Sequence, residues 1–364
     1  MLISSFKNIG ISAISCAVPT QEITAESVYS EHGQEYTDKI KKTIGVNTIR
    51  MSVKKQIASD LGYVAAKKII DHKGINPLDI GILVFVSQSH DYRLPATSCI
   101  LHNRLGLSVD CAAVDTNNGC SGFIYGSFII CSMLNSANCK HALLITGDTN
   151  TPKRKTKEYL DKRVSVPFGD GTAAVLFSKC DTAHTIDISL RTDGKGYHSL
   201  IHFNKSFRSL TYTDEELALG NRNVDFTLMN GKEVFKFTLT DVPKHVLEFL
   251  SHQNKKITDY DCVALHQPNL YMIQQMAKRI GADMKCVPLS IDKYGNTSSA
   301  SIPLTLVDKY GSLDKGTINT LMCGFGVGLY WGVMSANLDI DNILPMEFSD
   351  DYFVDPNLDL YEYD

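Results

Sequence analysis

One stretch of the chain is apolar on every side over a helical length. It spans residues 120–134 and reads CSGFIYGSFIICSML. A helix with no polar face cannot lie on a protein surface, so this segment must be enclosed by other parts of the fold. Two neighbouring runs, 80–87 (IGILVFVS) and 142–147 (ALLITG), are nearly continuously apolar. Runs of this length and composition predict strands that are buried on both faces.

Helices and strands alternate along the chain, beginning with an amphipathic helix predicted over 57–72. This alternation predicts an α/β protein with a mostly parallel sheet that is covered on both faces. The order of elements is repeated: Ile75 and Asp79 precede one apolar strand, and Ile257 and Asp261 precede another. Their offset of 182 residues is half of the 364-residue chain, which indicates a duplicated fold.

We place the join between the two halves near residues 178–185. The predicted units are an N-terminal half over 1–180, a C-terminal half over 181–337 and an acidic tail over 338–364. The tail contains nine acidic residues and no Lys or Arg, and the rest of the chain has 36 basic against 31 acidic residues. A body charge of about +5 is too small to predict nucleic-acid binding. A solvated surface and a frayed tail explain these charges equally well.

The composition is that of a soluble globular protein, with 43% hydrophobic and 21% charged residues. No apolar run reaches the roughly 18 residues that a membrane span needs, and the N-terminus lacks the pattern of a secretory signal. The ten cysteines show neither CxxC pairing nor the Cys/His spacing of a zinc site. We therefore expect a cytoplasmic protein with reduced thiols and no bound metal.

Three separate segments contain candidate catalytic residues. In DTNNGCSGFIYG, Cys120 precedes the enclosed helix, whose N-terminal dipole would favour the thiolate. In CVALHQPNL, His266 and Asn269 follow a buried strand, at the strand end where α/β sheets place catalytic groups. In KYGNTSSASIPLTL, Asn296 follows a glycine. Taken singly, these could be a passive core cysteine, a packed core histidine and a turn residue.

Two glycine-rich segments do not predict nucleotide binding. CGFGVGLYWG has no βαβ unit after it, since the acidic tail follows instead. FGDGTAAVLF, over 168–177, reads as a tight turn that leads into a strand and not as a phosphate loop.

The order Cys120, His266, Asn296 and a final glycine-rich turn resembles the ketoacyl synthase III family of the thiolase fold. The resemblance runs from about residue 6 to residue 335 and includes DLGYVAAKKII, DIGILVFVSQS, FGDG, LMNGKEVFKFTLTDVP, HQPN, GNTSSASIP and GFGVGLYWG. It implies a thiolase-like α/β fold of duplicated, layered αβαβα halves. It also implies an acyltransferase of fatty acid or related lipid metabolism that forms homodimers and has no permanently bound cofactor.

The resemblance also implies roles for individual residues. Cys120 would take the acyl group from a CoA thioester. His266 and Asn296 would donate hydrogen bonds to the thioester carbonyl of malonyl-acyl carrier protein while carbon dioxide leaves. The backbone N–H groups of Cys120 and Val327 would form the oxyanion hole. The residues expected to bind CoA or the carrier protein are Lys162, Lys236, Asn269, Lys278 and Arg279.

Several positions depart from the family pattern. The region DKIKKTIGV has no tryptophan to clamp the adenine of CoA, and Lys162 stands where an arginine has that purpose. Tyr271 replaces a carrier-docking arginine, and Leu94 replaces a phenylalanine that narrows the acyl pocket. With the added tail, these changes predict a specialised synthase instead of the general initiator of fatty acid synthesis.

Other functions stay open at this level. Cys120 could pass its acyl group to a hydroxyl or amine, with His266 as the general base and without a new carbon–carbon bond. A non-catalytic partner subunit would usually have lost the cysteine. The sequence has no motif for the added glutamate that HMG-CoA synthase-like chemistry requires.

Overall fold

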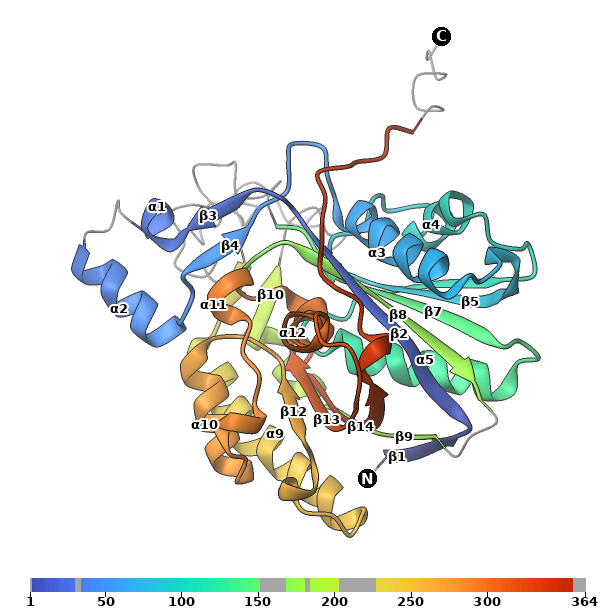
Figure 1. Ribbon diagram of the computed structural model, residues 1–364. Helices are drawn as coiled ribbons and strands as arrows, with labels where there is room; N and C mark the ends of the chain where they lie inside the picture. Colours follow the sequence, from blue (N-terminus) through green and yellow to red (C-terminus); the bar gives the residue numbers. More distant parts are fainter. Residues whose placement is uncertain (1, 30–33, 151–167, 181–183, 203–226, 356–364) are drawn as a thin grey trace.

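The computed structural model describes residues 2–29, 34–150, 168–180, 184–202 and 227–355. Two β-sheets lie roughly face to face, with helices between them and on both outer faces (Figure 1). The layers therefore run helix, sheet, helix, sheet, helix. This is the duplicated, layered α/β architecture that the resemblance predicted.

The first sheet has six strands, in the order β15-β2-β8-β7-β5-β6. Their bounds are Glu347–Phe348 for β15, Ile9–Val18 for β2, Gly171–Lys179 for β8, His141–Asp148 for β7, Ile80–Val86 for β5 and Ala112–Thr116 for β6. The second sheet has five strands, in the order β1-β9-β14-β13-β12. Their bounds are Leu2–Lys7, Thr185–Thr192, Tyr330–Asp339, Thr317–Gly326 and Cys262–Leu265.

Two helices fill the central layer: α5 (Gly122–Ser136) and α12 (Ser301–Tyr310), each in contact with both sheets. The all-apolar segment of the sequence is α5, so the prediction that it is enclosed is confirmed. Phe123, Ile124 and Ile130 are completely buried, and such side chains each stabilise the fold by about 1.5–3 kcal/mol.

Pairs of helices cover the two outer faces. On the first sheet lie α3 (Ala58–Lys73) and α4 (Thr97–Leu105), and on the second lies α9 (Gly231–His252), against which α10 (Leu270–Ile280) packs. The smaller elements are α1 (Ala25–Tyr29), α2 (Gln34–Ile44), α11 (Ile291–Tyr294), β3 (Glu22–Thr24), β4 (Thr48–Arg50), β10 (Leu200–His202) and β11 (Thr227–Met229). Short 3₁₀ turns span Pro77–Asp79, Gly194–Ser199, Ile257–Asp259, Met284–Cys286, Ser298–Ala300 and Ile340–Asn342.

The repeated order of elements is present in the structure. Helix α3, a 3₁₀ turn and strand β5 in the first half correspond to helix α9, a 3₁₀ turn and strand β12 in the second. The chain ends cross between the sheets, because β1 pairs with β9 and β15 pairs with β2. The division at residue 180 stays a prediction.

The expectation of mostly parallel sheets is wrong, because both sheets are mixed. Strands β5, β6 and β7 are parallel, and so are β12 and β13. Strand β8 pairs antiparallel with both β2 and β7. Strand β14 pairs antiparallel with both β13 and β9. The helix–strand alternation revealed only the strands joined by helices; β13 and β14 are joined by a tight turn instead.

Part of the acidic tail packs on the body. Strand β15 pairs with β2, and the Glu347 carboxylate forms an ion pair with Lys68 of α3. Further on, the Arg104 guanidinium lies between the rings of Tyr63 and Phe353, 4.6 and 4.7 Å from their centroids. A frayed tail is therefore a wrong description for 339–355; residues 356–364 lie outside the described chain.

The ion pair beneath this segment is nearly buried. Arg104 and Asp60 lie 2.9 Å apart, with side chains only 10% and 3% exposed, and Asp60 also accepts the backbone N–H of Phe353. Removing one partner of such a pair leaves an uncompensated buried charge, which typically costs about 3–5 kcal/mol. The tail segment thus shields the Arg104–Asp60 ion pair from water.

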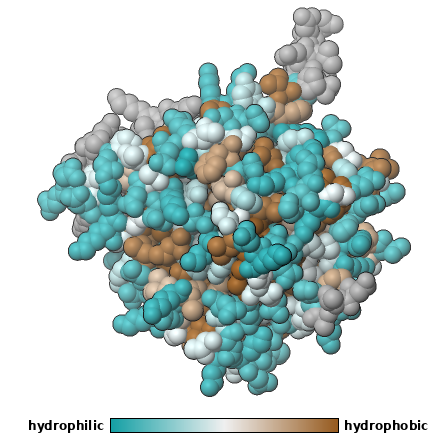
Figure 2. All heavy atoms as spheres, viewed as in Figure 1, coloured by the Kyte–Doolittle hydropathy of each residue, from teal (hydrophilic) through white to brown (hydrophobic). Residues whose placement is uncertain are grey.

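The visible surface is mainly hydrophilic, with smaller hydrophobic patches, one of them on the segment just before the grey C-terminal residues (Figure 2). Among the helices that the structure describes, none combines the length and apolarity needed to cross a membrane.

Candidate active site

Cys120 lies in the turn that leads from β6 into α5. The turn is closed by the Gly122 N–H, which donates to the Gly119 carbonyl at 2.6 Å. The end of β13 passes directly over the cysteine: a Cβ on Gly326 would lie 2.8 Å from the Cys120 Cβ and 3.5 Å from its Sγ. Only glycine permits this approach, which brings the Gly326–Val327 peptide beside the thiol.

His266 is the first residue after β12. Its backbone N–H donates to the Cys323 carbonyl of β13 at 2.9 Å, which extends the strand pairing by one residue. The ring packs edge-on against Phe325, with centroids 5.3 Å apart, and Nδ1 lies 2.7 Å from the Ser301 Oγ. Because Nδ1 has this partner, Nε2 is the ring nitrogen available to a bound substrate.

Asn296 is held by the FGDG turn, which begins at Phe168 and so lies more than a hundred residues earlier in the chain. The Gly169 N–H donates to the Asn296 carbonyl at 3.0 Å, and Phe168 forms a β-bridge with Asn296. A Cβ on Gly169 would lie 1.8 Å from the Tyr294 carbonyl oxygen, so this contact requires glycine. The Asn296 Oδ1 accepts the Ser298 N–H at 2.9 Å, which leaves the amide NH₂ to donate.

These three residues line one cavity of about 290 Å³. The rest of its wall is mostly apolar: Phe168, Leu200, Met229, Val234, Phe235, Phe237, Pro268, Met272, Phe325, Val327 and Leu329. Phe235, which is 39% exposed, stacks on Tyr271, with ring centroids 6.0 Å apart and planes within 10°. The cavity therefore suits a slender, largely uncharged chain that reaches the half-buried thiol of Cys120.

Neither titratable member of the trio is charged at neutral pH. Burial, followed by the charge of Asp148, raises the pKa of the Cys120 thiol to about 12; hydrogen bonds from Ser298 and Asn296 lower it by less. Burial lowers the pKa of His266 to about 3. The expectation of a thiolate is therefore wrong for the protein without substrate, because burial and the charge of Asp148 both favour the neutral thiol.

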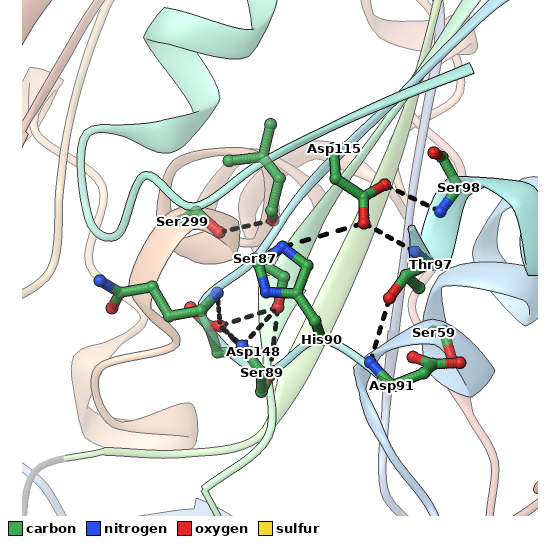
Figure 3. A network of polar contacts seen from close by, with 12 residues as sticks. Ser59, Ser87, Ser89, His90, Asp91, Thr97, Ser98, Asp115, Asp148 and Ser299 are labelled. Carbon is green, nitrogen blue, oxygen red and sulfur yellow. Dashed lines mark hydrogen bonds and ion pairs between the residues drawn. The ribbon is translucent and has the colours of Figure 1, made fainter. Parts of the chain in front are cut away.

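The Asp148 carboxylate organises the loop beside Cys120. Its Oδ1 accepts hydrogen bonds from the Ser87 hydroxyl at 2.9 Å and from the Gln88 N–H at 2.6 Å, and two more from Ser89 (Figure 3). The Gln88 side chain packs on Gly119, where a Cβ would lie 2.8 Å from its Oε1. Asp148 thus supports the turn that carries Cys120.

The remaining predicted site residues are divided. Val327 and Asn269 line the cavity, and the Asn269 Oδ1 also caps α10 by accepting the Met272 N–H at 2.8 Å. Lys236 on α9 is exposed and does not line the cavity, and the same is true of Lys278 and Arg279 in the last turn of α10. Lys162 lies outside the described residues.

Sequence reasoning missed the residues that support the trio. Ser298 and Ser301 belong to the quoted GNTSSASIP motif, but spacing alone assigned them no role. Asp148 could have been found, because it is a carboxylate at the end of a predicted buried strand. Within the described ranges, no group of three or more His, Cys, Asp or Glu side chains could hold a metal ion.

The layered, duplicated fold, with a cysteine at the head of its central helix and a cavity leading to it, defines a thiolase-like acyltransferase. Residues 114–194 match the family 3-oxoacyl-[acyl-carrier-protein] synthase III, and residues 250–338 match the C-terminal part of the same family. The first match contains Cys120 and the second contains His266 and Asn296.

Whole-chain comparisons agree. The chain is 32% identical over 330 residues to beta-ketoacyl-[acyl-carrier-protein] synthase III of Clostridioides difficile, covering 89% of this chain and 96% of that one. The Campylobacter curvus synthase III is 34% identical over 281 residues, or 76% and 81% of the two chains. A 3-oxoacyl-(acyl-carrier protein) synthase structure from Burkholderia xenovorans superposes with a TM-score of 0.86 at 30% identity, covering 96% and 99%. The chain belongs to the beta-ketoacyl-ACP synthase III family.

The raised pKa of Cys120 predicts an unusual labelling profile. Because the thiolate is the reactive form, the iodoacetamide labelling rate of Cys120 should rise about tenfold per pH unit up to pH 10, without a plateau. Asp148→Asn should increase the rate at a given pH, since it removes a negative charge that disfavours the thiolate. Peptide mass spectrometry after timed labelling measures both rates. A plateau near pH 8 would contradict the prediction; the exposed Cys99 serves as an internal check on the reagent.

Proposed function

We propose that this protein forms a carbon–carbon bond by decarboxylative condensation of an acyl-cysteine with malonyl-acyl carrier protein. The observation that carries the proposal is the meeting of Cys120, His266 and Asn296 in one apolar cavity. The family assignment supports the acyl-thioester chemistry.

In the first half-reaction, the Cys120 sulfur attacks the carbonyl carbon of the donor thioester. The acyl–sulfur bond of the donor breaks, and its thiolate leaves as a thiol with the proton that Cys120 gives up. The backbone N–H groups of Cys120 and Val327, two residues that line the cavity, are proposed to stabilise the oxyanion. Because the resting thiol is neutral, its proton is lost during the attack and not before it.

In the second half-reaction, His266 and Asn296 donate hydrogen bonds to the thioester carbonyl of the malonyl group. The bond to the carboxylate breaks, carbon dioxide leaves, and its electron pair forms an enolate on the extender. The enolate carbon attacks the acyl carbon on Cys120, the bond from that carbon to the cysteine sulfur breaks, and the thiolate takes up a proton from solvent. The donor role suits a histidine that burial keeps neutral.

The alternative is acyl transfer to a hydroxyl or amine, with His266 as the general base. A base works best when its pKa lies near the operating pH, and burial lowers the pKa of His266 to about 3. The local electrostatics therefore favour condensation over simple transfer.

Variants of the trio separate the two half-reactions. Cys120→Ala should take no acyl group from an acyl-CoA, whereas His266→Ala and Asn296→Ala should still be acylated. Both of the latter should release carbon dioxide from malonyl-acyl carrier protein about 10²–10³ times more slowly, since each removes a preorganised donor. Intact mass measures acylation and carbon dioxide release measures decarboxylation. Normal condensation by Asn296→Ala would contradict the mechanism and favour simple transfer.

We also propose that the protein is a specialised synthase and not the general initiator. Tyr271 stacks on Phe235 at the cavity mouth, where the family pattern has an arginine, and Leu94 replaces a phenylalanine. The packed tail segment over 339–355 is a further departure. The acylation assay, run with a panel of acyl-CoA chain lengths, identifies the preferred donor.

The free state of all ten cysteines supports a reducing compartment, for which we propose the cytoplasm.

The acidic carrier protein is proposed to dock beside the cavity mouth, on the exposed face of α9 and α10. That face offers Lys236, Lys278 and Arg279, with the Phe235–Tyr271 pair between the helices. The described part of the acidic tail packs on α3 and α4 and not on these cations.

Reversing the charges on α10 should therefore weaken carrier binding. In steady-state kinetics, Lys278→Glu/Arg279→Glu should raise the KM for malonyl-acyl carrier protein while leaving acylation of Cys120 by acyl-CoA unchanged. The difference from wild type should shrink as salt shortens the Debye length to about 8 Å. Lys67→Glu is the control, because it reverses a charge on α3, which covers the first sheet and not the second. An unchanged KM without salt dependence would place the docking surface elsewhere.

We propose a homodimer that forms through the first sheet. Strand β6 is the edge of that sheet, and the adjacent loop is held rigidly: Asp115 accepts the Thr97 and Ser98 N–H groups and faces His90 (Figure 3). The tip of this ordered loop nevertheless presents Leu94 at 82% exposure. A rigid loop with an exposed apolar tip beside an open sheet edge is suited to a second copy of the chain.

Sedimentation should show a species of twice the 40.3 kDa chain mass at micromolar concentration. Leu94→Asp should shift the equilibrium toward the monomer by more than tenfold, because it places a charge in the apolar contact. Leu313→Asp alters a residue that is 51% exposed in the other half and should leave the equilibrium unchanged. A wild-type protein that sediments only as a monomer would refute the dimer.

A further inference from the structure

The hydroxyl of Ser301 lies against the inner nitrogen of the His266 ring. Its Oγ is 2.7 Å from Nδ1, and the two residues are 1% and 2% exposed. Ser301 is the first residue of α12, so the central helix presents this hydroxyl to the ring from the side opposite the cavity. At this distance the two groups share one hydrogen, and which atom donates it determines what the other ring nitrogen can do.

The position of Ser301 is fixed by a closed set of buried hydrogen bonds. Its carbonyl accepts the Thr305 hydroxyl at 2.7 Å, and the Thr305 Oγ1 lies 2.6 Å from the Ser290 Oγ. The Ser290 N–H in turn donates to the Oε1 of Gln267, the residue that follows His266. These bonds tie the first turn of α12 to the end of β12, so neither the hydroxyl nor the ring can move alone.

Counting hydrogens around this contact identifies the donor. A neutral imidazole carries one N–H. If it were on Nδ1, it would donate to the Ser301 Oγ and leave the buried hydroxyl hydrogen without an acceptor, because His266 is the sole partner of this hydroxyl among the described residues. An unsatisfied buried donor is unfavourable. If Ser301 donates instead, both its hydroxyl hydrogen and the Nδ1 lone pair have a partner, and the remaining N–H, on Nε2, faces the cavity.

We propose that Ser301 is a positioning residue that holds His266 in the Nε2-protonated tautomer. In that form His266 is a hydrogen-bond donor toward the cavity and has no lone pair there to act as a base. For its catalytic consequence the inference rests on the proposed condensation, in which Nε2–H stabilises the enolate oxygen. The tautomer itself is a property of the substrate-free protein.

Nitrogen NMR of protein labelled with ¹⁵N in its histidine rings tests this directly. The chain has 11 histidines, and the His266 signals are identified by their loss in His266→Gln. The expected spectrum shows a protonated Nε2 and an unprotonated, hydrogen-bond-accepting Nδ1. In Ser301→Ala, the Nδ1 signal should move and a population with protonated Nδ1 should appear. Ser299→Ala is the matched control, since the Ser299 hydroxyl has one hydrogen-bond partner among the described residues, the Val86 carbonyl at 3.5 Å.

Activity provides the second readout. Ser301→Ala should slow malonyl decarboxylation by about 10- to 100-fold, as does loss of the partner that orients a metal-bound histidine. Acylation of Cys120 should stay at the wild-type rate, and Ser299→Ala should keep both rates.

Two results would overturn the inference: a wild-type His266 protonated on Nδ1, or identical His266 signals in wild type and Ser301→Ala. The wild-type spectrum alone tests the tautomer, even if Ser301→Ala does not fold. Failure of the proposed condensation would look different, because His266→Ala would then decarboxylate normally whatever the tautomer.

Discussion

The enclosure of α5 between two sheets is the constraint on which the rest of the structure depends. A helix without a polar face needs apolar partners all around, and one sheet can cover only one side of it. The duplicated fold supplies a second sheet, and α12 fills the remaining space in the same layer. Because Cys120 sits at the head of α5, the helix also fixes the position of this thiol in the cavity that it shares with His266 and Asn296.

The protein surroundings of the trio set the charge states of its members. Desolvation keeps both the Cys120 thiol and the His266 ring neutral, although a cysteine–histidine pair elsewhere can be a thiolate and an imidazolium. A neutral trio presents hydrogen-bond donors without a fixed charge. Such a site favours negative charge that develops on a substrate oxygen, which both proposed half-reactions would generate.

The sequence predicted much of this and failed where neighbours in space are distant along the chain. The helix over 57–72 and the strands at 80–87 and 142–147 are present because periodicity and apolar runs report local burial. Strand β8 was predicted after the FGDG turn, whereas β2, β9 and β14 were missed because tight turns and extended loops, unlike crossover helices, leave no periodic signal. The trio itself came from a resemblance; what Ser301 and Gly169 do depends on contacts that no spacing reveals.

The acidic tail shows how charge composition can mislead. Nine acidic residues suggested a free, solvated segment, yet part of it packs against cations that the body carries: Lys68 binds Glu347, and the Arg50 guanidinium lies 5.0 Å from the Phe348 ring centroid. The Arg50 carbonyl also accepts the Asp170 N–H of the FGDG turn, whose Gly169 holds Asn296. The body's excess of positive charge is thus partly a docking surface for its own C-terminal segment. Two hydrogen bonds connect that surface to Asn296, one from the Asp170 N–H to Arg50 and one from the Gly169 N–H to Asn296, so the tail and Asn296 share the FGDG turn as their support.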